Sequence, residues 1–415
     1  MRKSLIRFLY LLLFCIIIPF MNHPILQNYK TINQINTTNK KVLLRVDLNV
    51  PLHNGIIIDD YRLQAILPTL ALLQKNNTHI ILATHIGRPT NKNPELSTQH
   101  LMPWFKQHGF TITYAATIEQ AKQLLENSSA NTLILLENLR FFAGEKNHDA
   151  NFAQQLAALA DCYVNDAFAL LHRNDTSITL VPKLFDQNHK AIGPLIIQEL
   201  NALNKLLNNP KKPFVLIIGG GKVETKLPLI NNLLDLVDTV LLCPAVVNTF
   251  LYAQGKPVGK SLVIPELTTT AQEIIQRAKQ KKVTLYFPLD YQVALDTLKR
   301  DLIEMDNDYF PANALAIAIG SKTITQWAPL ITQAHTLFFN GSMGFADRPD
   351  TLKSLYALLH LIAQSDAYTV IGGGDSVAAV NKLGIANNIS YLSTGGGATI
   401  TYLSGQPLIG LLTMN

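Results

Sequence analysis

The sequence has few cysteines and little charge. Only Cys15, Cys162 and Cys243 occur among 415 residues, and their wide spacing excludes a disulfide framework and a cysteine-based zinc site. This cysteine usage favours a reducing compartment. Charged residues make up 15% of the chain and hydrophobic residues 48%, which excludes an intrinsically disordered protein. A chain of this length predicts two domains rather than one hydrophobic core.

The chain also lacks several binding motifs. No lysine- or arginine-rich block and no nucleic-acid motif accompanies the net charge of +6, so we expect small anionic ligands and no nucleic acid. No Gly-x-Gly-x-x-Gly fingerprint is present, which argues against a dinucleotide oxidoreductase. The segment Gly255–Ser261 resembles a P-loop, but only three residues separate its glycines where a P-loop has four. We interpret it as an ordinary loop.

Polar side chains follow a short apolar run near the start of the chain. Val42–Val46 predicts a buried strand, and Asp47 and Asn49 follow it directly. Ligands bind at the carboxyl ends of strands in open α/β sheets. A turn at His53–Gly55 and a helix that opens at Arg62 come next. On this stretch alone, the ordinary polar ends of a strand and a helix are an equally good explanation.

The same pattern recurs along the first half of the chain. Further predicted strands, at 79–84, 132–136 and 162–168, are each followed by an arginine, and the first and the last also by a histidine. One arginine after a strand is usually solvated or salt-bridged. Several of them at the carboxyl edge of one parallel sheet would form a cationic patch that suits phosphate or carboxylate. The cations in question are His85, Arg88, Arg140 and Arg173.

Glycine-rich turns dominate the second half. A strand at 214–218 leads into Gly219–Gly221, with Lys222 and Lys226 at the start of a predicted helix. Similar turns occur at Gly372–Ser376 and Ser393–Ala398, each before a predicted helix. Such turns bring backbone N–H groups and the helix dipole to a phosphate. Asp375 suits Mg²⁺ bound with phosphate oxygens, although a helix N-cap is the alternative role.

Taken in order, these segments resemble the phosphoglycerate kinase family. The resemblance rests on Arg45–Pro51, Asp59–Arg62, His85–Pro89, Glu137–Arg140 and Asn165–Phe168, and it extends over nearly everything after about Ile32. It implies an α/β fold of two doubly wound, parallel-sheet, Rossmann-like domains joined by an interdomain helix and hinge. The implied parts are a substrate domain (21–190), the helix and hinge (191–212), a nucleotide domain (213–400), and a C-terminal segment (401–415) that returns to the first domain.

The resemblance implies a kinase of glycolysis and gluconeogenesis. Its reaction is the reversible transfer of a phosphoryl group between ATP and the carboxylate of 3-phosphoglycerate, giving ADP and 1,3-bisphosphoglycerate. The enzyme would be a monomeric, cytoplasmic, hinge-bending transferase that uses Mg²⁺. The implied catalytic residues are Arg62 and Lys222. The implied substrate-binding residues are Asp47, Leu48, Asn49, Arg62, His85, Ile86, Gly87, Arg88, Arg140 and Arg173. The implied nucleotide-binding residues are Lys226, Asn340, Asp347, Gly372, Gly373, Gly374, Asp375 and Ser376, with Asp375 also the magnesium ligand.

The chain departs from the family pattern at several positions. Asp175 stands where the family usually has a second histidine, and Gly221 stands for an alanine. The segments around Cys243, Ala318 and Asp347, which flank the adenosine in the family, also differ. We expect these changes to alter substrate contacts and nucleotide affinity or preference. A catalytically inactive nucleotide-binding protein is the rival hypothesis, although Arg62, Lys222 and Asp375 are retained.

Residues 1–20 form a separate problem. Arg2, Lys3 and Arg7 precede an apolar run from Phe8 to Ile18, as in a signal peptide, but no small-residue cleavage site follows. The run is also shorter than the ~20 residues of a membrane-spanning helix. An anchor, an export signal and a start assigned too early, with Met21 as the first residue, all remain open. We favour the last, and expect no stable membrane association, because the remainder resembles a cytoplasmic enzyme.

Overall fold

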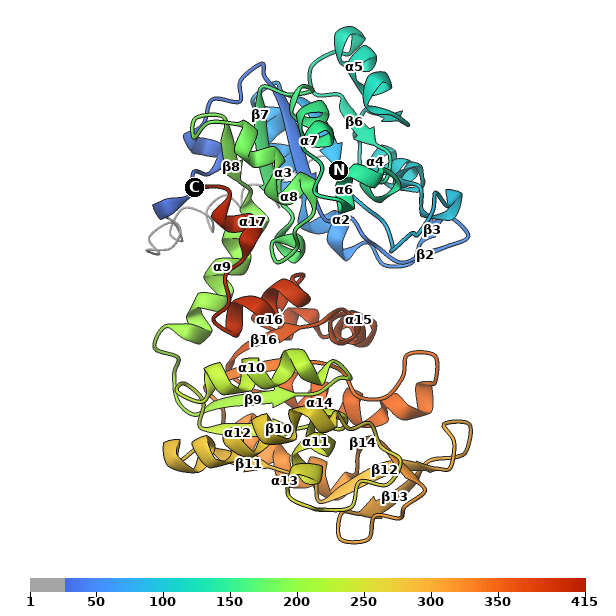
Figure 1. The fold of residues 1–415 in the computed structure, drawn as a ribbon, viewed down its shortest axis with the longest axis vertical. Helices are drawn as coiled ribbons and strands as arrows, with labels where there is room; N and C mark the ends of the chain where they lie inside the picture. Colours follow the sequence, from blue (N-terminus) through green and yellow to red (C-terminus); the bar gives the residue numbers. More distant parts are fainter. Residues whose placement is uncertain (1–26) are drawn as a thin grey trace. The chain divides into compact units, whose positions relative to one another are not determined.

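The computed structural model describes residues 27–415. They form two compact units (Figure 1): unit 1 takes the described chain up to Asn201 together with Pro407–Asn415, and unit 2 takes Ala202–Gln406. The boundary falls inside helix α9 (Pro194–Leu207). The predicted segment at 1–20 lies outside the described residues. From residue 27 onward, no helix is both long enough and apolar enough to cross a membrane.

Unit 1 is built on six parallel strands, each formed by a short apolar run. They are β1 (Lys41–Val46), β4 (His79–Ala83), β5 (Ile112–Ala115), β6 (Leu133–Leu136), β7 (Cys162–Asp166) and β8 (Lys190–Ile192). Their order is β5-β6-β4-β1-β7-β8, and all neighbours pair in parallel. The chain leaves β1 toward β4 on one side and leaves β7 toward β8 on the other. The topological switch point, where ligands bind in such sheets, therefore lies between β1 and β7.

Helices connect these strands and bury their apolar sides against the sheet. They are α2 (Tyr61–Ala65), α3 (Leu67–Lys75), α4 (Met102–Gln107), α5 (Ile118–Asn127), α6 (Ala143–Lys146), α7 (Ala150–Ala157) and α8 (Thr176–Thr179). Leu63, Ile66, Leu70 and Leu73 are fully buried and pack with the strand side chains into one core. Burying each such side chain contributes about 1.5–3 kcal/mol.

Two smaller features complete unit 1. The predicted turn at His53–Gly55 joins β2 (Leu52–His53) to β3 (Ile56–Ile57), with positive φ at Asn54 and Gly55, as Asn-Gly hairpin turns require. The C-terminal helix α17 (Ile409–Leu412) packs in the same unit: the Gly410 N–H donates to the Leu171 carbonyl at 2.8 Å. Lys190 Nζ donates to the Asn415 carbonyl at 2.9 Å.

Unit 2 repeats the parallel architecture and adds an antiparallel sheet. Its main sheet has the order β11-β10-β9-β15-β16-β17 and is parallel throughout. The strands are β9 (Phe214–Ile218), β10 (Thr239–Leu242), β11 (Thr284–Tyr286), β15 (Thr336–Asn340), β16 (Tyr368–Gly372) and β17 (Tyr391–Ser393). The chain leaves β9 and β15 in opposite directions, so their carboxyl ends form the switch point. The antiparallel sheet is β13 (Ile303–Asp306), β12 (Asp290–Leu295) and β14 (Ala314–Ile319).

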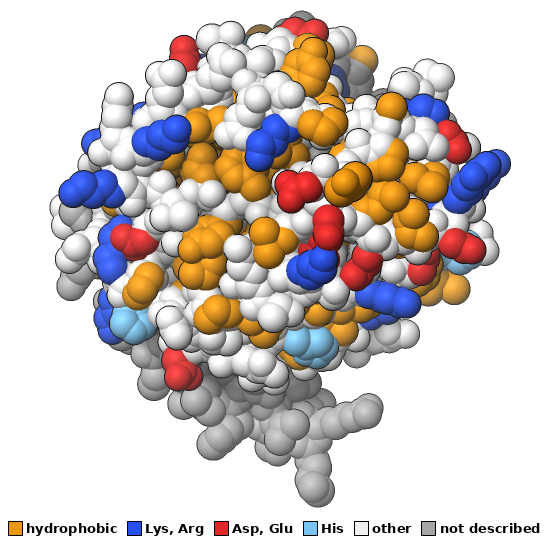
Figure 2. Space-filling model, turned by 90° about the horizontal axis from the view of Figure 1, so that it is seen from below, with side chains coloured by type: hydrophobic (Ala, Val, Ile, Leu, Met, Phe, Trp, Pro, Cys, Tyr) orange, Lys and Arg blue, Asp and Glu red, His pale blue; other side chains and the backbone are white. Residues whose placement is uncertain are grey.

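Longer helices cover the main sheet of unit 2. They are α10 (Val223–Leu233), α11 (Val246–Ala253), α12 (Thr268–Lys281), α13 (Ser321–Thr332), α14 (Lys353–Ala363), α15 (Gly374–Leu383) and α16 (Gly397–Leu403). The predicted fold class of two parallel-sheet α/β units is therefore confirmed. The face of the molecule in Figure 2 carries basic and acidic side chains interspersed with apolar ones. That face offers no extended surface of one charge.

Candidate active site

Four of the predicted site residues of unit 1 follow the carboxyl ends of neighbouring strands. Asp47 comes directly after β1, and His85 comes after β4. Arg140 lies in a 3-10 turn, Leu139–Phe141, after β6, and Arg173 follows another such turn, Phe168–Leu170, after β7. Because the four strands are parallel, these side chains belong to one edge of the sheet. We call Arg62, His85, Arg140 and Arg173, with Asp47 beside them, the cationic patch.

Short polar contacts hold the loops of this edge together. Arg62 forms an ion pair with Asp47, whose other oxygen lies 3.8 Å from His85 Nδ1. The Gly87 N–H donates to Asn49 Oδ1 at 2.7 Å, and the Gly87 carbonyl accepts from Arg140. The loops after β1, β4 and β6 are thereby joined through a glycine whose φ is +64°. The apolar side chains of Leu48 and Ile86 are buried in the core beneath these loops.

Burial and mutual repulsion shift the pKa values in the cationic patch. Burial and the neighbouring Arg173 lower the pKa of Arg140 to about 10. The pKa of Arg62 is lowered too, mainly by burial. Burial holds the pKa of His85 well below its ordinary value, and nearby guanidinium groups lower it further, so its imidazole is neutral at pH 7. The guanidinium groups of Arg140 and Arg173 lie close enough together for Arg173 to lower the pKa of Arg140. Perturbed pKa values of this kind are typical of functional sites.

Several donors in the cationic patch lack a hydrogen bond within the described residues. Arg140 Nε and Nη2 and Arg173 Nε are buried and make no hydrogen bond within the described part of the chain. Leaving such a donor unsatisfied costs about 1–3 kcal/mol. Arg88 differs from them because its side chain is exposed, yet its charge helps lower the pKa of Arg173. Arg88 therefore lies at the rim rather than inside.

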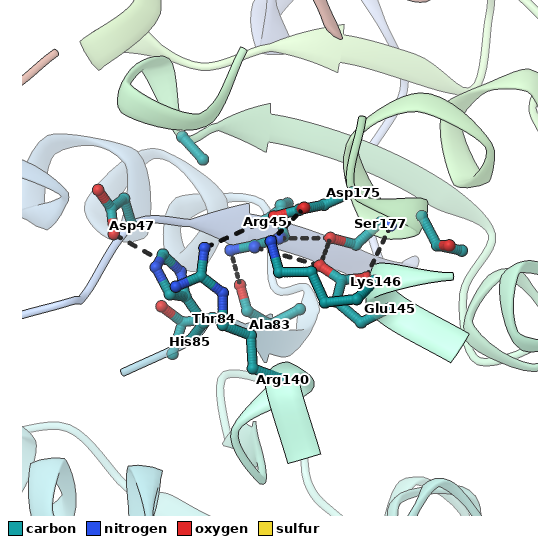
Figure 3. A network of polar contacts seen from close by, with 12 residues as sticks. Arg45, Asp47, Ala83, Thr84, His85, Arg140, Glu145, Lys146, Asp175 and Ser177 are labelled. Carbon is teal, nitrogen blue, oxygen red and sulfur yellow. Dashed lines mark hydrogen bonds and ion pairs between the residues drawn. The ribbon is translucent and has the colours of Figure 1, made fainter. Parts of the chain in front are cut away.

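A buried polar network supports the cationic patch, and the sequence analysis gave it no role. Arg45 in β1 is fully buried and lies 3.5 Å from the Glu145 carboxylate (Figure 3). Its Nε donates to Ser177 Oγ at 2.7 Å, and Ser177 Oγ donates to Glu145 at 2.6 Å. The available signal was an arginine inside an otherwise apolar strand. Nothing in the sequence identified its partners, since they come from α6 and α8.

In unit 2, three loops approach one another through glycines. Gly219 follows β9, Gly341 follows β15, and Gly373 follows β16. A Cβ on Gly341 would lie 1.9 Å from the Gly219 carbonyl oxygen, so no larger residue fits there without moving the backbone. Gly373 has a φ of +103° and is the N-cap of α15. Asp375 therefore lies in the first turn of α15, and the alternative role of N-cap is wrong.

Polar side chains surround these glycines. Lys226, only 4% exposed, donates to Asn340 Oδ1. Burial, together with the charge of Lys222, lowers the pKa of Lys226 to about 8. Asn340 Nδ2 and Ser376 Oγ are buried without a hydrogen-bond partner among residues 27–415. These groups converge on the carboxyl ends of β15 and β16, where α15 presents its N-terminus.

The remaining predicted residues of unit 2 are exposed. Lys222 lies at the N-cap position of α10, and Asp375 accepts a long hydrogen bond from Ser342 Oγ at 3.5 Å. Asp347 is exposed in a turn closed by a bridge between Phe345 and Arg348. Within residues 27–415, no hydrogen bond or ion pair joins the Asp347 side chain to the glycine-rich turns.

A protein-family model described as phosphoglycerate kinase matches residues 32–406. The chain belongs to the phosphoglycerate kinase family. A phosphoglycerate kinase of Clostridium botulinum (strain Eklund 17B / Type B) is 38% identical over 394 residues, covering 94% of this chain and 99% of the relative. One of Helicobacter hepaticus is 36% identical over 389 residues, covering 92% of this chain and 96% of the relative.

Solved phosphoglycerate kinases are similar as well. The enzyme of Coxiella burnetii has a TM-score of 0.77 and 33% identity, covering 93% of this chain and 98% of that one. The enzyme of Pyrococcus horikoshii has a TM-score of 0.78 and 27% identity with the same coverage. The predicted family and enzyme class, a kinase that transfers a phosphoryl group reversibly between ATP and 3-phosphoglycerate, are thereby confirmed.

Proposed function

We propose that unit 1 binds 3-phosphoglycerate or 1,3-bisphosphoglycerate at the cationic patch, and that unit 2 binds ATP or ADP at its glycine-rich turns. The observation that carries this assignment is that Arg140 Nε and Arg173 Nε are buried and make no hydrogen bond within residues 27–415. Guanidinium groups match phosphate and carboxylate oxygens in geometry and charge. Asp47 and Asn49 would orient the ligand, and Arg88 would contact it from the exposed edge of the cationic patch.

In unit 2, Lys226, Asn340 and Ser376 would meet the nucleotide phosphates. The two buried unpartnered groups, Asn340 Nδ2 and Ser376 Oγ, support this role. The backbone of Gly372–Gly374 would approach the phosphates closely because it has no side chains in the way. Asp347 would reach the ribose from its exposed turn, as the family pattern implies.

The residues present fit a magnesium ion carried by the nucleotide. Across residues 27–415 no group of three or more His, Cys, Asp or Glu side chains could hold a metal ion by itself. Asp375 is exposed beside the N-terminus of α15 and offers one carboxylate. Mg²⁺ often takes one carboxylate and completes its shell with phosphate oxygens and water. When bound, the ion would neutralise part of the phosphate charge.

The chemistry needs alignment and charge stabilisation rather than a base. The nucleophile is a carboxylate, which is already ionised at neutral pH. His85 is neutral and buried, so it can orient a ligand by hydrogen bonding without carrying a proton away. We assign stabilisation of the transferring phosphoryl group to Arg62 and Lys222. The substrates bind to separate units, so we also propose hinge motion within residues 191–212, between a substrate domain (21–190) and a nucleotide domain (213–400).

A coupled assay of the purified full-length chain tests the proposal. We expect ATP turnover that requires both 3-phosphoglycerate and Mg²⁺, and chelation of Mg²⁺ should abolish it. Turnover without 3-phosphoglycerate, or none with it, would contradict the assignment. We further propose a monomer in the cytoplasm, which light scattering and cell fractionation would check. Mass spectrometry of the native N-terminus would decide between the starts at Met1 and Met21.

A further inference from the structure

Asp175 places a carboxylate beside the cationic patch. The residue is only 4% exposed. One oxygen, Oδ1, lies 2.7 Å from Lys146 Nζ, and the other, Oδ2, lies 3.8 Å from Arg140 Nη2. Figure 3 shows the ion pairs of this carboxylate with the two cations. An anion is therefore already present next to a guanidinium group that the proposed substrate would use.

Helix capping does not account for this carboxylate. Asp175 occupies the N-cap position of α8, yet its side chain makes no capping hydrogen bond. Asp149, the N-cap of the neighbouring helix α7, behaves differently, because its carboxylate accepts from the Phe152 N–H at 2.8 Å. The two residues occupy equivalent positions on adjacent helices. Only Asp175 directs its carboxylate to the cations.

Arg140 does not depend on Asp175 for its orientation. Its Nη1 donates to the Gly87 carbonyl, and the loop that carries it is held by Asn138, whose Nδ2 donates to the Ile86 and Leu96 carbonyls at 2.7 and 2.8 Å. Asp175 is also the charge that most opposes the lowering of the pKa of Arg173. Its main effect on the cationic patch is therefore to reduce the positive potential that an incoming anion meets.

We propose that Asp175 sets the affinity of the cationic patch by competing with the anionic substrate for Arg140 and Lys146. The inference rests on the proposed function of unit 1. Substrate binding would replace the Asp175 carboxylate at Arg140 by an anionic group of the substrate. The substrate would also contact Lys146, whose side chain is 47% exposed and can turn toward a ligand. Asp175 thus keeps binding weaker than the cations alone would make it, and favours release of the product.

The test compares Asp175→Asn with Asp149→Asn in the full-length chain. Both variants change the net charge equally, and Asn can still cap α7 at position 149. Calorimetry should show that Asp175→Asn binds 3-phosphoglycerate roughly twofold to fivefold more tightly, on the scale of one partly exposed ion pair. The Asp149→Asn variant should bind like wild type. The gain at position 175 should shrink in 0.5 M KCl, since salt screens the removed repulsion.

Kinetics separate this role from a structural one. The KM for 3-phosphoglycerate should fall in Asp175→Asn, while the KM for Mg-ATP stays within twofold of wild type. Equal or weaker 3-phosphoglycerate binding overturns the inference, since it would mean that Asp175 is neutral or holds Arg140 in place. If Asp175→Asn does not fold by circular dichroism, Asp175→Ser removes the same charge with a smaller side chain and carries the same expectations.

The inference and the proposed function can fail separately. A wild-type chain that binds no 3-phosphoglycerate overturns both of them. Binding of 3-phosphoglycerate without turnover overturns the proposed reaction alone, and the calorimetric comparison of position 175 still stands. Wild-type binding and turnover, with no gain in affinity on removal of the Asp175 carboxylate, overturns the inference alone.

Discussion

Nucleotide binding should depend on pH through Lys226. Burial and the charge of Lys222 lower the pKa of Lys226 from 10.5 to about 8 in the free protein. Nucleotide phosphates would favour the charged ammonium and raise that pKa again. Binding should therefore take up protons near pH 8. The contribution of Lys226 is fully present below pH 8 and is lost as the pH rises above it.

The size of the change in nucleotide affinity follows from the change in the pKa of Lys226. If phosphate contact restores the ordinary pKa of 10.5 from about 8, the change corresponds to about 3 kcal/mol. At pH 9 about nine tenths of Lys226 would be neutral in the free protein, so we expect the Kd for Mg-ADP to rise about tenfold between pH 7 and pH 9. At pH 8, about half a proton should be taken up for each nucleotide bound.

Calorimetry of Mg-ADP binding at pH 7, 8 and 9, in buffers of different ionisation enthalpy, measures both quantities. Lys226→Met keeps the length of the side chain and should remove most of the proton uptake, beyond that of the nucleotide itself. Lys279→Met, on the exposed face of α12, should behave like wild type. Equal proton uptake by wild type and Lys226→Met would refute the reasoning, because the ammonium would then not contact the phosphates.

Three further predictions concern catalysis and stability. Arg62→Ala should lower kcat about a hundredfold or more in the coupled assay, with nucleotide affinity unchanged; turnover near wild type would remove Arg62 from the transferring group. Asp375→Ala should weaken Mg-ATP binding in calorimetry and leave 3-phosphoglycerate affinity unchanged; equal losses would contradict the division of ligands between the units. Burial raises the pKa of Asp166 from 3.8 to about 7, so the folded state holds its proton more tightly than the unfolded chain. The free energy of unfolding should therefore fall by about 3 kcal/mol between pH 4 and pH 7, relative to Asp166→Asn, in urea titrations.

Five strands of the two main sheets, β5, β8, β10, β11 and β15, were not predicted from the sequence. The other strands were predicted, together with the polar residues or glycines that follow them. This was possible because short β-branched runs followed by glycine or polar residues depend mainly on local chemistry. The helix after Arg62 was predicted less well. Its apolar spacing indicated one helix, but the structure divides it at Ile66 into α2 and α3, with Pro68 in the first turn of α3. Proline lacks an N–H and fits only the first turn of a helix, so it favours a new start there.

Contacts between distant segments could not be predicted in this way. The Arg45–Glu145 ion pair and the burial of Lys226 depend on which segments the sheet brings together. The antiparallel sheet of β12, β13 and β14 in unit 2 was also absent from the predictions. The backbone conformation of Ala245 could not be predicted from the sequence either. It has a φ of +71°, a conformation that glycine adopts more readily, where the family pattern has a glycine-rich turn.

Unpartnered buried donors do not mark a ligand site by themselves. Trp327 Nε1 is buried without a partner among the described residues, and it lies on a helix that carries no predicted site residue. The donors on Arg140 and Arg173 differ because they belong to neighbouring cations at the carboxyl ends of parallel strands. A neutral indole that lacks a partner loses one hydrogen bond, whereas crowded guanidinium groups also repel one another. A bound anion relieves both costs at once, so the coincidence of charge, burial and sheet edge supports the proposed anion site in unit 1.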